Sequence, residues 1–404
     1  MKLEDLKDKK ILILGYGKEG KDTYKALKTL FPKKKIAISD QNKIFQKGEK
    51  IFFDKDYLNN LNDFDVIIKT PGIPIEKVKT KKIVTTQTEL FFDNFKGLII
   101  GVTGTKGKGT VSSLIYHILK KAGIKVSLGG NIGEPVLEKL LKTKGDDIFV
   151  YELSSHQLQT LKQSPQIAVF LNLYPDHLDY YRNKEEYFKA KENIFKYQNV
   201  NDSLIYNSKL NLKTKARKIA FDKINKSFET NLKGEFNQLN IKAAFCVAKL
   251  FNIKDSIIKE AIKEFKGLEH RLEYVGKYKG IDFYDDSMST IPEVTIKALE
   301  ALIETDTLIF GGSDKGSDYS LLERKIKNIK NIIILGKGTG DKIKREKIIV
   351  DSMKQAIELA FKVTKKVCLL SPGSASFNLF SDYKERGDLF KKWVKHYGKK
   401  TSNH

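Results

Sequence analysis

Cysteine is rare in this sequence, which contains only Cys246 and Cys368. Both lie in apolar runs ("AAFCVAKL" and "KKVCLLSPG") with no cysteine or histidine at metal-ligand spacing. This excludes a disulfide framework and a cysteine metal site, and it predicts two small buried side chains in a reducing compartment.

Long apolar runs are missing as well, since no stretch approaches the roughly 18–20 residues that cross a bilayer. The first residues, "MKLEDLKDKKILILGYG", place acids before a very short apolar run, unlike a signal peptide. We therefore expect a cytoplasmic protein with no membrane partner.

Arginine is scarce, although the formal net charge is +24. Such a charge is typical of nucleic-acid binders. However, the lysines are spread along the whole chain, and arginine is the residue that base-reading surfaces favour. We expect no nucleic-acid partner. A non-catalytic nucleic-acid binder stays open as an alternative, marked by salt-dependent association with DNA and no ATP turnover.

Strands and helices are predicted to alternate along the 404 residues. This length is too great for a single hydrophobic core and predicts several domains. Apolar strands are predicted at "KKILILGYG", "KGLIIGVTG" and "KVCLLSPG", and helices at "KDTYKALKTLF", "GTVSSLIYHILKKAG" and "PEVTIKALEALIE". This alternation predicts an α/β protein with parallel sheets covered by helices.

Two glycine-rich turns indicate binding of phosphate groups. The first, "GYGKEG", contains Gly15, Gly17 and Gly20 and is followed by Asp40 at the end of the next strand. This pattern fits a dinucleotide-binding turn, so a nicotinamide-dependent oxidoreductase is one alternative. Any nucleotide diphosphate can use such a turn, because a helix N-terminus binds anions generally.

The second turn, "GVTGTKGKGT" at residues 101–110, stands between a predicted strand and a predicted helix. Backbone N–H groups of such a loop surround phosphate oxygens, and Lys108 adds a positive charge. A phosphate loop usually carries Ser or Thr directly after this lysine to bind Mg²⁺, but here the residue is Gly109. Thr110 supplies the nearest hydroxyl, and we predict a weakened affinity for Mg²⁺.

Acidic residues and a histidine follow the next two predicted strands. Glu152 ends "DIFVYE", while Asp176, His177 and Asp179 follow "IAVFL". The carboxyl ends of parallel strands meet at one edge of a sheet, so these groups can converge on the phosphate loop. Carboxylate oxygens suit Mg²⁺ beside a nucleotide.

Ten short motifs in order give the chain a resemblance to the Mur ligase family. They are "TGTKGKGT", "GGNIGEP", "ELSSHQL", "LNLYPDHLDYY", "KAKENIF", "GEFNQLN", "GLEHRLE", "DDSMST", "GGSDKG" and "LLSPGSASFNLF". The resemblance is strongest to the branch that adds glutamate to UDP-N-acetylmuramoyl-L-alanine. Branches that add diaminopimelate, lysine or a dipeptide match less well.

The resemblance implies three domains. Residues 1–93 form an N-terminal Rossmann-like unit for the UDP-sugar, residues 94–267 a central P-loop ATPase-like parallel-sheet domain, and residues 268–404 a C-terminal Rossmann-like domain for glutamate. It assigns "GYGKEG" to uridine diphosphate. The implied UDP-sugar residues are Gly17, Lys18, Glu19, Asp40, Thr70, Pro71, Gly72, Asn131, Ser154 and Gln157.

The resemblance also implies ATP and Mg²⁺ as cofactors, with catalytic roles for Lys108, Lys191 and His177. Glu152 and His177 match magnesium ligands, Thr110 is a further candidate, and Lys191 matches a lysine that relatives carbamylate to a carboxylate. The ATP-binding residues are Gly104, Thr105, Lys106, Gly107, Lys108, Gly109, Thr110, Asn237, Asn240, Arg271 and Asp286. His270 belongs to a hinge before the last domain.

For glutamate, the resemblance implies binding by Thr290, Lys315, Ser376 and Tyr383. Met288 stands where many D-glutamate enzymes carry a lysine, and Lys106 stands where many relatives carry asparagine. We expect D-glutamate as the substrate, with L-glutamate as the alternative.

The implied reaction is ATP-dependent amide synthesis through an acyl phosphate, carried out by a monomer on UDP-N-acetylmuramoyl-L-alanine and glutamate. Catalysis is expected to come mainly from positioning and charge neutralisation, because a carboxylate must meet a polyanionic phosphate chain. An inactive, degenerate ligase remains an alternative because of Gly109.

Overall fold

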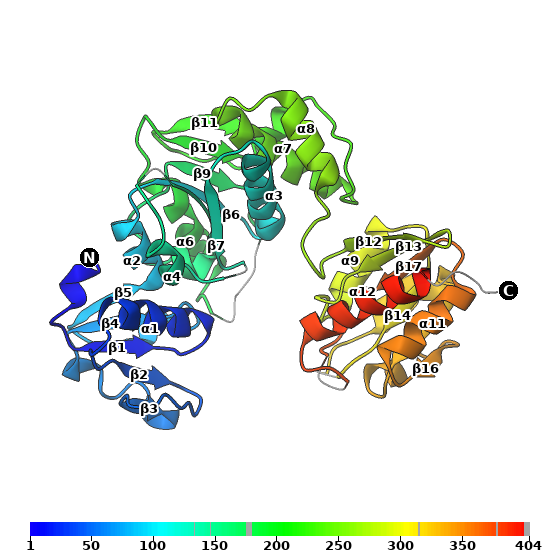
Figure 1. Cartoon of the computed structure of the whole chain (residues 1–404), viewed down its shortest axis with the longest axis horizontal. Coiled ribbons are helices and arrows are strands. Elements are labelled where there is room, and N and C mark those ends of the chain that lie inside the picture. Colours follow the sequence, from blue (N-terminus) through cyan, green and yellow to red (C-terminus); the bar gives the residue numbers. More distant parts are fainter. Residues whose placement is uncertain (133, 146, 175–179, 314–315, 377–378, 400–404) are drawn as a thin grey trace. The chain divides into compact units, whose positions relative to one another are not determined.

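The computed structural model describes residues 1–132, 134–145, 147–174, 180–313, 316–376 and 379–399. The described chain contains three β-sheets, one in each of the three predicted segments (Figure 1). It divides into two compact units, Met1–Ser227 with Leu239–Ala261, and Phe228–Gln238 with Ile262–His404. The first unit holds the first two sheets and the second unit holds the third. The three domain limits stay our proposal.

The first sheet is parallel, with the strand order β3-β2-β1-β4-β5. Its strands are β1 (Ile11–Leu14), β2 (Ala37–Asp40), β3 (Ile51–Phe53), β4 (Val66–Lys69) and β5 (Ile83–Thr86). Its helices are α1 (Lys18–Leu30) and α2 (Gln87–Asn94). The order reverses direction at β1 and β4, which is where parallel sheets bind ligands beyond the strand ends.

The second sheet is also parallel, with the order β11-β10-β9-β6-β8-β7. Its strands are β6 (Leu98–Thr103), β7 (Val126–Gly130), β8 (Ile148–Glu152), β9 (Ile167–Phe170), β10 (Ser203–Tyr206) and β11 (Arg217–Ala220). The helices of this segment are α3 (Lys108–Lys121), α4 (Leu137–Leu140), α5 (Ser155–Leu158), α6 (Lys184–Lys196), α7 (Glu235–Leu250) and α8 (Asp255–Glu264). The central strands β6, β8 and β9 are buried except at the first residues of β6 and β8, as expected when helices cover both faces of a parallel sheet.

The first two sheets share one hydrophobic core. Phe91 of α2 packs on Phe149 and Tyr151 of β8, with ring centroids 4.6 and 5.1 Å apart. Asp22 of α1 accepts hydrogen bonds from the backbone N–H of Leu137 (2.9 Å) and from Gln87 Nε2 (2.8 Å). The apolar contact and the buried polar contact together explain why the two sheets form one compact unit.

The third sheet has the order β12-β13-β17-β14-β15-β16, and only β12 and β13 pair antiparallel. Its strands are β12 (Glu273–Tyr278), β13 (Ile281–Asp285), β14 (Thr305–Phe310), β15 (Asn331–Leu335), β16 (Ile348–Val350) and β17 (Val367–Leu370). Its helices are α9 (Pro292–Ala301), α10 (Ser320–Lys325), α11 (Met353–Val363) and α12 (Tyr383–Lys399). Helices α11 and α12 lie side by side over one core of this sheet, and α9 and α10 contribute to the other (Figure 1).

Short 3₁₀ helices occur at Glu4–Leu6, Asp54–Asp56, Leu61–Asp63, Ile75–Lys77, Phe221–Lys223, Ile326–Asn328 and Thr339–Lys342. Cys246 and Cys368 are buried free thiols, which confirms their prediction as hydrophobic side chains. Within the described ranges, the helices are all too short or too polar to cross a membrane.

Candidate active site

The phosphate loop connects β6 to α3, as the sequence predicts. Gly104 and Gly107 have φ angles of 154° and 87°, in the region that favours glycine. A Cβ atom at Gly107 would lie 2.6 Å from Asn240 Oδ1, so the loop packs closely against Asn240 of α7. Helix α3 begins at Lys108 without a side-chain cap, which leaves its first N–H groups available to an anion.

Lys108 folds back onto the phosphate loop. Its ammonium group donates hydrogen bonds to the carbonyl oxygens of Gly104 (2.9 Å) and Thr105 (3.1 Å). These contacts keep the positive charge of Lys108 beside the N-terminus of α3. The same helix turn contains Gly109, which is buried, and Thr110, which is partly buried.

Glu152 lies at the carboxyl end of β8, the strand beside β6. The residue is 3% exposed, and its carboxylate accepts a hydrogen bond from Asn131 Nδ2 at 2.6 Å. The N–H of Asn131 also donates to the backbone carbonyl of Glu152 at 3.0 Å. The structure therefore brings these two predicted residues together, one from the loop after β7 and one from β8.

Lys191 lies in the interior of the protein beside the phosphate loop, while its predicted carbamylation stays a prediction. Its Nζ donates to the carbonyl of Gly104 at 3.0 Å and to Thr103 Oγ1 at 3.4 Å. The side chain is 1% exposed. A lysine on a polar helix is ordinarily solvated. Burial therefore distinguishes Lys191 from the exposed lysines of α6.

The predicted UDP-sugar turns of the first sheet are in direct contact. A Cβ atom at Gly15 would lie 1.9 Å from Thr70 Oγ1, so only glycine fits there. Asp40 Oδ2 accepts a hydrogen bond from the N–H of Tyr16 at 2.6 Å, which ties β2 to the glycine turn. Gly17 precedes α1, and Lys18 at its first position is exposed. Pro71 and Gly72 follow Thr70 in the neighbouring turn.

Glu19 connects the first sheet to the second. Its Oε1 accepts a hydrogen bond from Gln157 Nε2 at 2.6 Å, and Gln157 Oε1 accepts from the N–H of Ser154 at 2.9 Å. Burial raises the pKa of Glu19 to about 7, and Glu19 Oε2 is buried without a hydrogen-bond partner among the described residues. Glu19, Ser154 and Gln157 are predicted to contact the UDP-sugar from two different segments, and these hydrogen bonds show that they lie together.

Lys69 was not predicted as a site residue, yet it holds the "TPG" turn in place. Lys69 is 1% exposed, and its ammonium group donates to the carbonyl oxygens of Thr70 (3.0 Å) and Ile73 (2.7 Å). Burial lowers the pKa of Lys69 to about 8, opposed by the negative charge of Glu19. A lysine closing the apolar strand "VIIK" was the available signal in the sequence.

In the second unit, Asp286 follows β13 and is nearly fully buried. Its carboxylate accepts hydrogen bonds from Ser289 Oγ, from Ser371 Oγ (2.8 Å) and from the N–H of Leu272 (3.0 Å). Burial raises the pKa of Asp286 to about 6. The carboxylate thus joins three loops of the third sheet, while its predicted ribose contact stays a prediction.

Two further buried residues of this unit are His270, which the resemblance assigns to a hinge, and Arg386, which the sequence does not predict as a site residue. His270 Nδ1 lies 2.8 Å from Asp285 Oδ2, and Arg386 of α12 is completely buried. Arg386 donates to Ser287 Oγ (3.0 Å) and to the carbonyl oxygens of Ser287 (2.8 Å) and Ser374 (3.2 Å). Burial lowers its pKa to about 10. Arg386 therefore connects the loops after β13 and β17.

The other predicted residues have the following positions. Lys106 and Arg271 are exposed, Thr290 and Tyr383 are partly buried, and Ser376 and Asn237 are buried. Asn237 belongs to the second unit, where its Nδ2 donates to the carbonyl of Lys233 at 2.7 Å. His177 and Lys315, together with Asp176 and Asp179, lie outside the described residues, so their predicted roles stay predictions.

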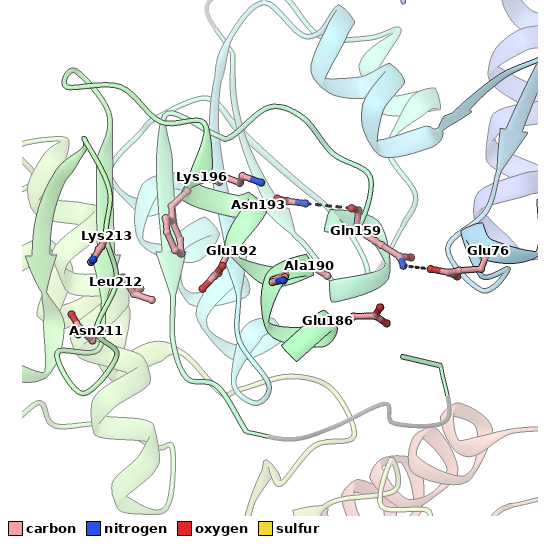
Figure 2. Close-up of a pocket in the computed structure, with 12 residues that line it drawn as sticks. Glu76, Gln159, Glu186, Ala190, Glu192, Asn193, Lys196, Asn211, Leu212 and Lys213 are labelled. Carbon is pink, nitrogen blue, oxygen red and sulfur yellow. Dashed lines mark hydrogen bonds between the residues drawn. The ribbon is translucent and has the colours of Figure 1, made fainter. Parts of the chain in front are cut away.

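A cavity of about 750 Å³ lies beside α6 and not at the phosphate loop (Figure 2). Residues of α6 that line it include Lys189, Glu192 and Lys196, on the side of the helix away from Lys191. Figure 2 shows Gln159 linked to Glu76 and Asn193 at its edge. The lining mixes acidic and basic groups and does not single out one class of ligand.

Comparison with known proteins supports the family suggested by the motifs. Residues 102–226 match the family model described as the Mur ligase middle domain. A UDP-N-acetylmuramoylalanine–D-glutamate ligase of Oenococcus oeni is 34% identical over 433 residues, covering 96% of this chain and 97% of the relative. A ligase of the same name from Clostridium kluyveri is 34% identical and covers 86% of each chain.

Solved structures show the same fold. The MurF ligase of Thermotoga maritima, crystallised with ADP, superposes with a TM-score of 0.58 at 19% identity, covering 98% of this chain and 97% of that one. This agrees with the α/β class and the three sheets predicted from the sequence. With a relative at 34% identity over nearly its entire length, the chain belongs to the Mur ligase family.

Proposed function

We propose that this protein is an ATP-dependent ligase that joins D-glutamate to UDP-N-acetylmuramoyl-L-alanine in peptidoglycan precursor synthesis. The observation that carries the proposal is the near full-length similarity to relatives named for this reaction. Their names specify D-glutamate, so L-glutamate is not favoured despite Met288. The cytoplasm is the compartment in which we place the reaction, and a monomer is its proposed form.

The residues around the phosphate loop support ATP as the energy source. Gly104 and Gly107 give the loop the backbone angles that let N–H groups face an anion. Lys108 keeps its ammonium group next to these N–H groups, held by two loop carbonyls. In this proposal the positive groups neutralise the phosphate chain so that an anionic carboxylate can approach it.

The reaction would proceed in two steps. First, an oxygen of the alanyl carboxylate attacks the γ-phosphorus of ATP, and ADP leaves as an acyl phosphate forms. Second, the glutamate amine attacks the acyl carbon, the amide bond forms, and phosphate leaves together with a proton from the amine. The chain's own contribution is to orient both anions and to keep water away from the acyl phosphate.

The donor set near the loop fits Mg²⁺. Glu152 offers a buried carboxylate oriented by Asn131, and Thr110 offers a hydroxyl in the first turn of α3. His177 and Lys191, the latter as a carbamate, complete the proposed set. When bound, the ion would neutralise phosphate charge, which is the usual role of Mg²⁺ beside nucleotides.

Phosphate release is the direct test of this function. The purified full chain is incubated with ATP, Mg²⁺ and UDP-N-acetylmuramoyl-L-alanine, and free phosphate is measured with D-glutamate, with L-glutamate and with neither. We expect release only with D-glutamate, together with the amide product. If phosphate is released with L-glutamate and not with D-glutamate, the substrate is L-glutamate. If phosphate is released without any added amino acid, the protein is not acting as a ligase.

Two alternatives make different predictions. An inactive ligase would bind the UDP-sugar and release no phosphate under any of these conditions. A nicotinamide oxidoreductase would bind NADH at the first glycine turn, which a fluorescence titration detects. We expect no NADH binding, because the relatives of this chain are ligases.

A further inference from the structure

Tyr187 is a buried residue of α6 that contacts the phosphate loop. Its hydroxyl lies 3.1 Å from Thr105 Oγ1, and the side chain is 1% exposed. Thr105 Oγ1 also donates to the carbonyl of Tyr174 at 3.1 Å and accepts from the N–H of Tyr174 at 2.9 Å. The Thr105 hydroxyl thus connects the loop before Lys108 to α6 and to the chain after β9.

Tyr187 also touches Lys191, one helical turn further along α6. The Lys191 Nζ lies 5.0 Å from the centre of the Tyr187 ring, within the range of a cation–π contact. Residues four apart on a helix lie on the same face, so Tyr187 and Lys191 face the loop together. Both side chains meet consecutive loop residues, because Lys191 Nζ donates to Gly104 and Tyr187 contacts Thr105.

We propose that Tyr187 is a positioning residue for ATP, acting through Thr105 and Lys191. Its hydroxyl fixes the loop residue that lies three positions before Lys108, and its ring packs beside the side chain of Lys191. The inference rests on the proposed function, since it assigns Tyr187 to the ATP site of the ligase. It adds a residue of α6 that the motif "KAKENIF" does not contain.

A purely structural role is the competing explanation. Tyr187 packs against Tyr181 at 5.6 Å and against Phe188 at 5.8 Å, so it also belongs to an aromatic cluster. A packing role depends on the ring and predicts lower stability when the ring is removed. A positioning role depends on the hydroxyl and predicts weaker nucleotide binding when only the hydroxyl is removed.

The test uses Tyr187→Phe, which keeps the ring and deletes the hydroxyl. Binding of N-methylanthraniloyl-labelled ATP and of UDP-N-acetylmuramoyl-L-alanine is measured at equilibrium on the full chain, beside the thermal midpoint. We expect nucleotide affinity to fall about 3- to 10-fold, the usual range for one hydrogen bond. Affinity for the UDP-sugar should stay within about twofold of that of the unmodified protein, because the hydroxyl contact described for Tyr187 is with the phosphate loop.

Two further variants sharpen the result. Tyr206→Phe is the matched control, because it deletes a tyrosine hydroxyl from β10 in the same compact unit. Thr105→Val is combined with Tyr187→Phe in a double-mutant cycle. If Tyr187 acts through Thr105, the second substitution weakens nucleotide binding less in the Tyr187→Phe background than it does alone.

Three results would overturn the inference. They are unchanged nucleotide affinity in Tyr187→Phe, equal weakening for nucleotide and UDP-sugar, and full additivity in the cycle. Binding of labelled ATP to the unmodified chain separates failure of this inference from failure of the proposed function. If the unmodified chain binds no labelled ATP, the proposed function fails. If the unmodified chain and Tyr187→Phe bind labelled ATP equally tightly, only the role of Tyr187 fails.

Discussion

Glu19 and Lys69 place opposite charges inside the first unit, and burial acts on both. It raises the pKa of Glu19 to about 7 and lowers that of Lys69 to about 8. An unfolded glutamate titrates near 4.5. Between pH 4.5 and about pH 7, the folded protein therefore binds more protons at Glu19 than the unfolded chain does. The free energy of unfolding falls as the pH rises through this window, and the full loss of stability is present above about pH 7.

Replacing Glu19 by Gln tests this electrostatic cost. The amide oxygen of Gln can still accept the hydrogen bond from Gln157, but the buried charge is gone. We expect a higher thermal midpoint than that of the unmodified chain at pH 8, and little difference at pH 5. Glu185→Gln, at a glutamate 59% exposed on α6, is the control. Identical pH profiles for the Glu19→Gln variant and the unmodified chain would contradict the assignment.

Gly109 leaves the phosphate loop without a hydroxyl group directly after Lys108. Its position directly after Lys108 carries a hydroxyl in most phosphate loops, and that hydroxyl binds Mg²⁺. Gly109→Ser should lower the Mg²⁺ concentration that half-saturates phosphate release by about tenfold, equivalent to about 1.4 kcal/mol. Unchanged magnesium dependence would show that Gly109 does not weaken the metal site.

At the scale of elements, the phosphate loop depends on Gly107. Its φ of 87° disfavours any residue with a Cβ, and a Cβ there would lie 2.6 Å from Asn240 Oδ1. A left-handed backbone costs a non-glycine residue about 1–2 kcal/mol. We expect Gly107→Ala to lower ATP affinity at least about tenfold in an equilibrium titration.

Gly123, at the other end of α3, is the matched control for Gly107. Its φ is 78°, and a Cβ there would meet no atom of the described chain within 4 Å. Gly123→Ala carries the same backbone strain without displacing the loop. It should lower the thermal midpoint slightly and leave ATP affinity unchanged. Equal losses of ATP affinity in both variants would contradict a local role for Gly107.

In the second unit, Arg386 holds two loops together with a completely buried side chain. Arg386→Ala would leave the carbonyl oxygens of Ser287 and Ser374 without these donors. We expect a loss of about 3 kcal/mol or more in the free energy of unfolding, measured by urea denaturation of the full chain. Arg324→Ala removes an exposed arginine from the same unit and should cost less than about 0.5 kcal/mol.

The elements that the sequence predicted well are those with a local pattern. The strand before "GTKGKGT" and the helix after it follow from apolar runs and glycines, and the structure confirms both as β6 and α3. The burial of Lys191 and Arg386 could not be read from such patterns. Each of these side chains is buried because carbonyl oxygens from distant segments accept its hydrogen bonds, which is a tertiary effect.

At the scale of the whole molecule, the sequence suggested three domains but not how they share cores. Phe91 and Phe149 lie in different predicted domains, yet they pack in one hydrophobic cluster. The apolar character of Phe91 and Phe149 predicts that both side chains are buried. It does not predict that they pack against each other. The third sheet has its own two cores, so the second unit is a separate compact part of the chain.

The whole molecule must bring together two anions, the alanyl carboxylate and ATP. We assign this task to the first unit, because the UDP-sugar turns, Glu152 and the phosphate loop occur in this one compact body. Lys108 is the first residue of α3, and its ammonium group is held against the phosphate loop. Its removal should abolish chemistry while leaving the UDP-sugar turns around Gly15 and Thr70 intact.

The most direct test of the central claim is amide formation by Lys108→Ala. With D-glutamate, ATP and UDP-N-acetylmuramoyl-L-alanine, we expect kcat to fall by at least about 10²–10³-fold, as for loss of one group that stabilises transition-state charge. UDP-sugar binding should persist, and Lys120→Ala at the other end of α3 should remain active. Full amide-forming turnover in Lys108→Ala would contradict the claim that this loop activates the carboxylate.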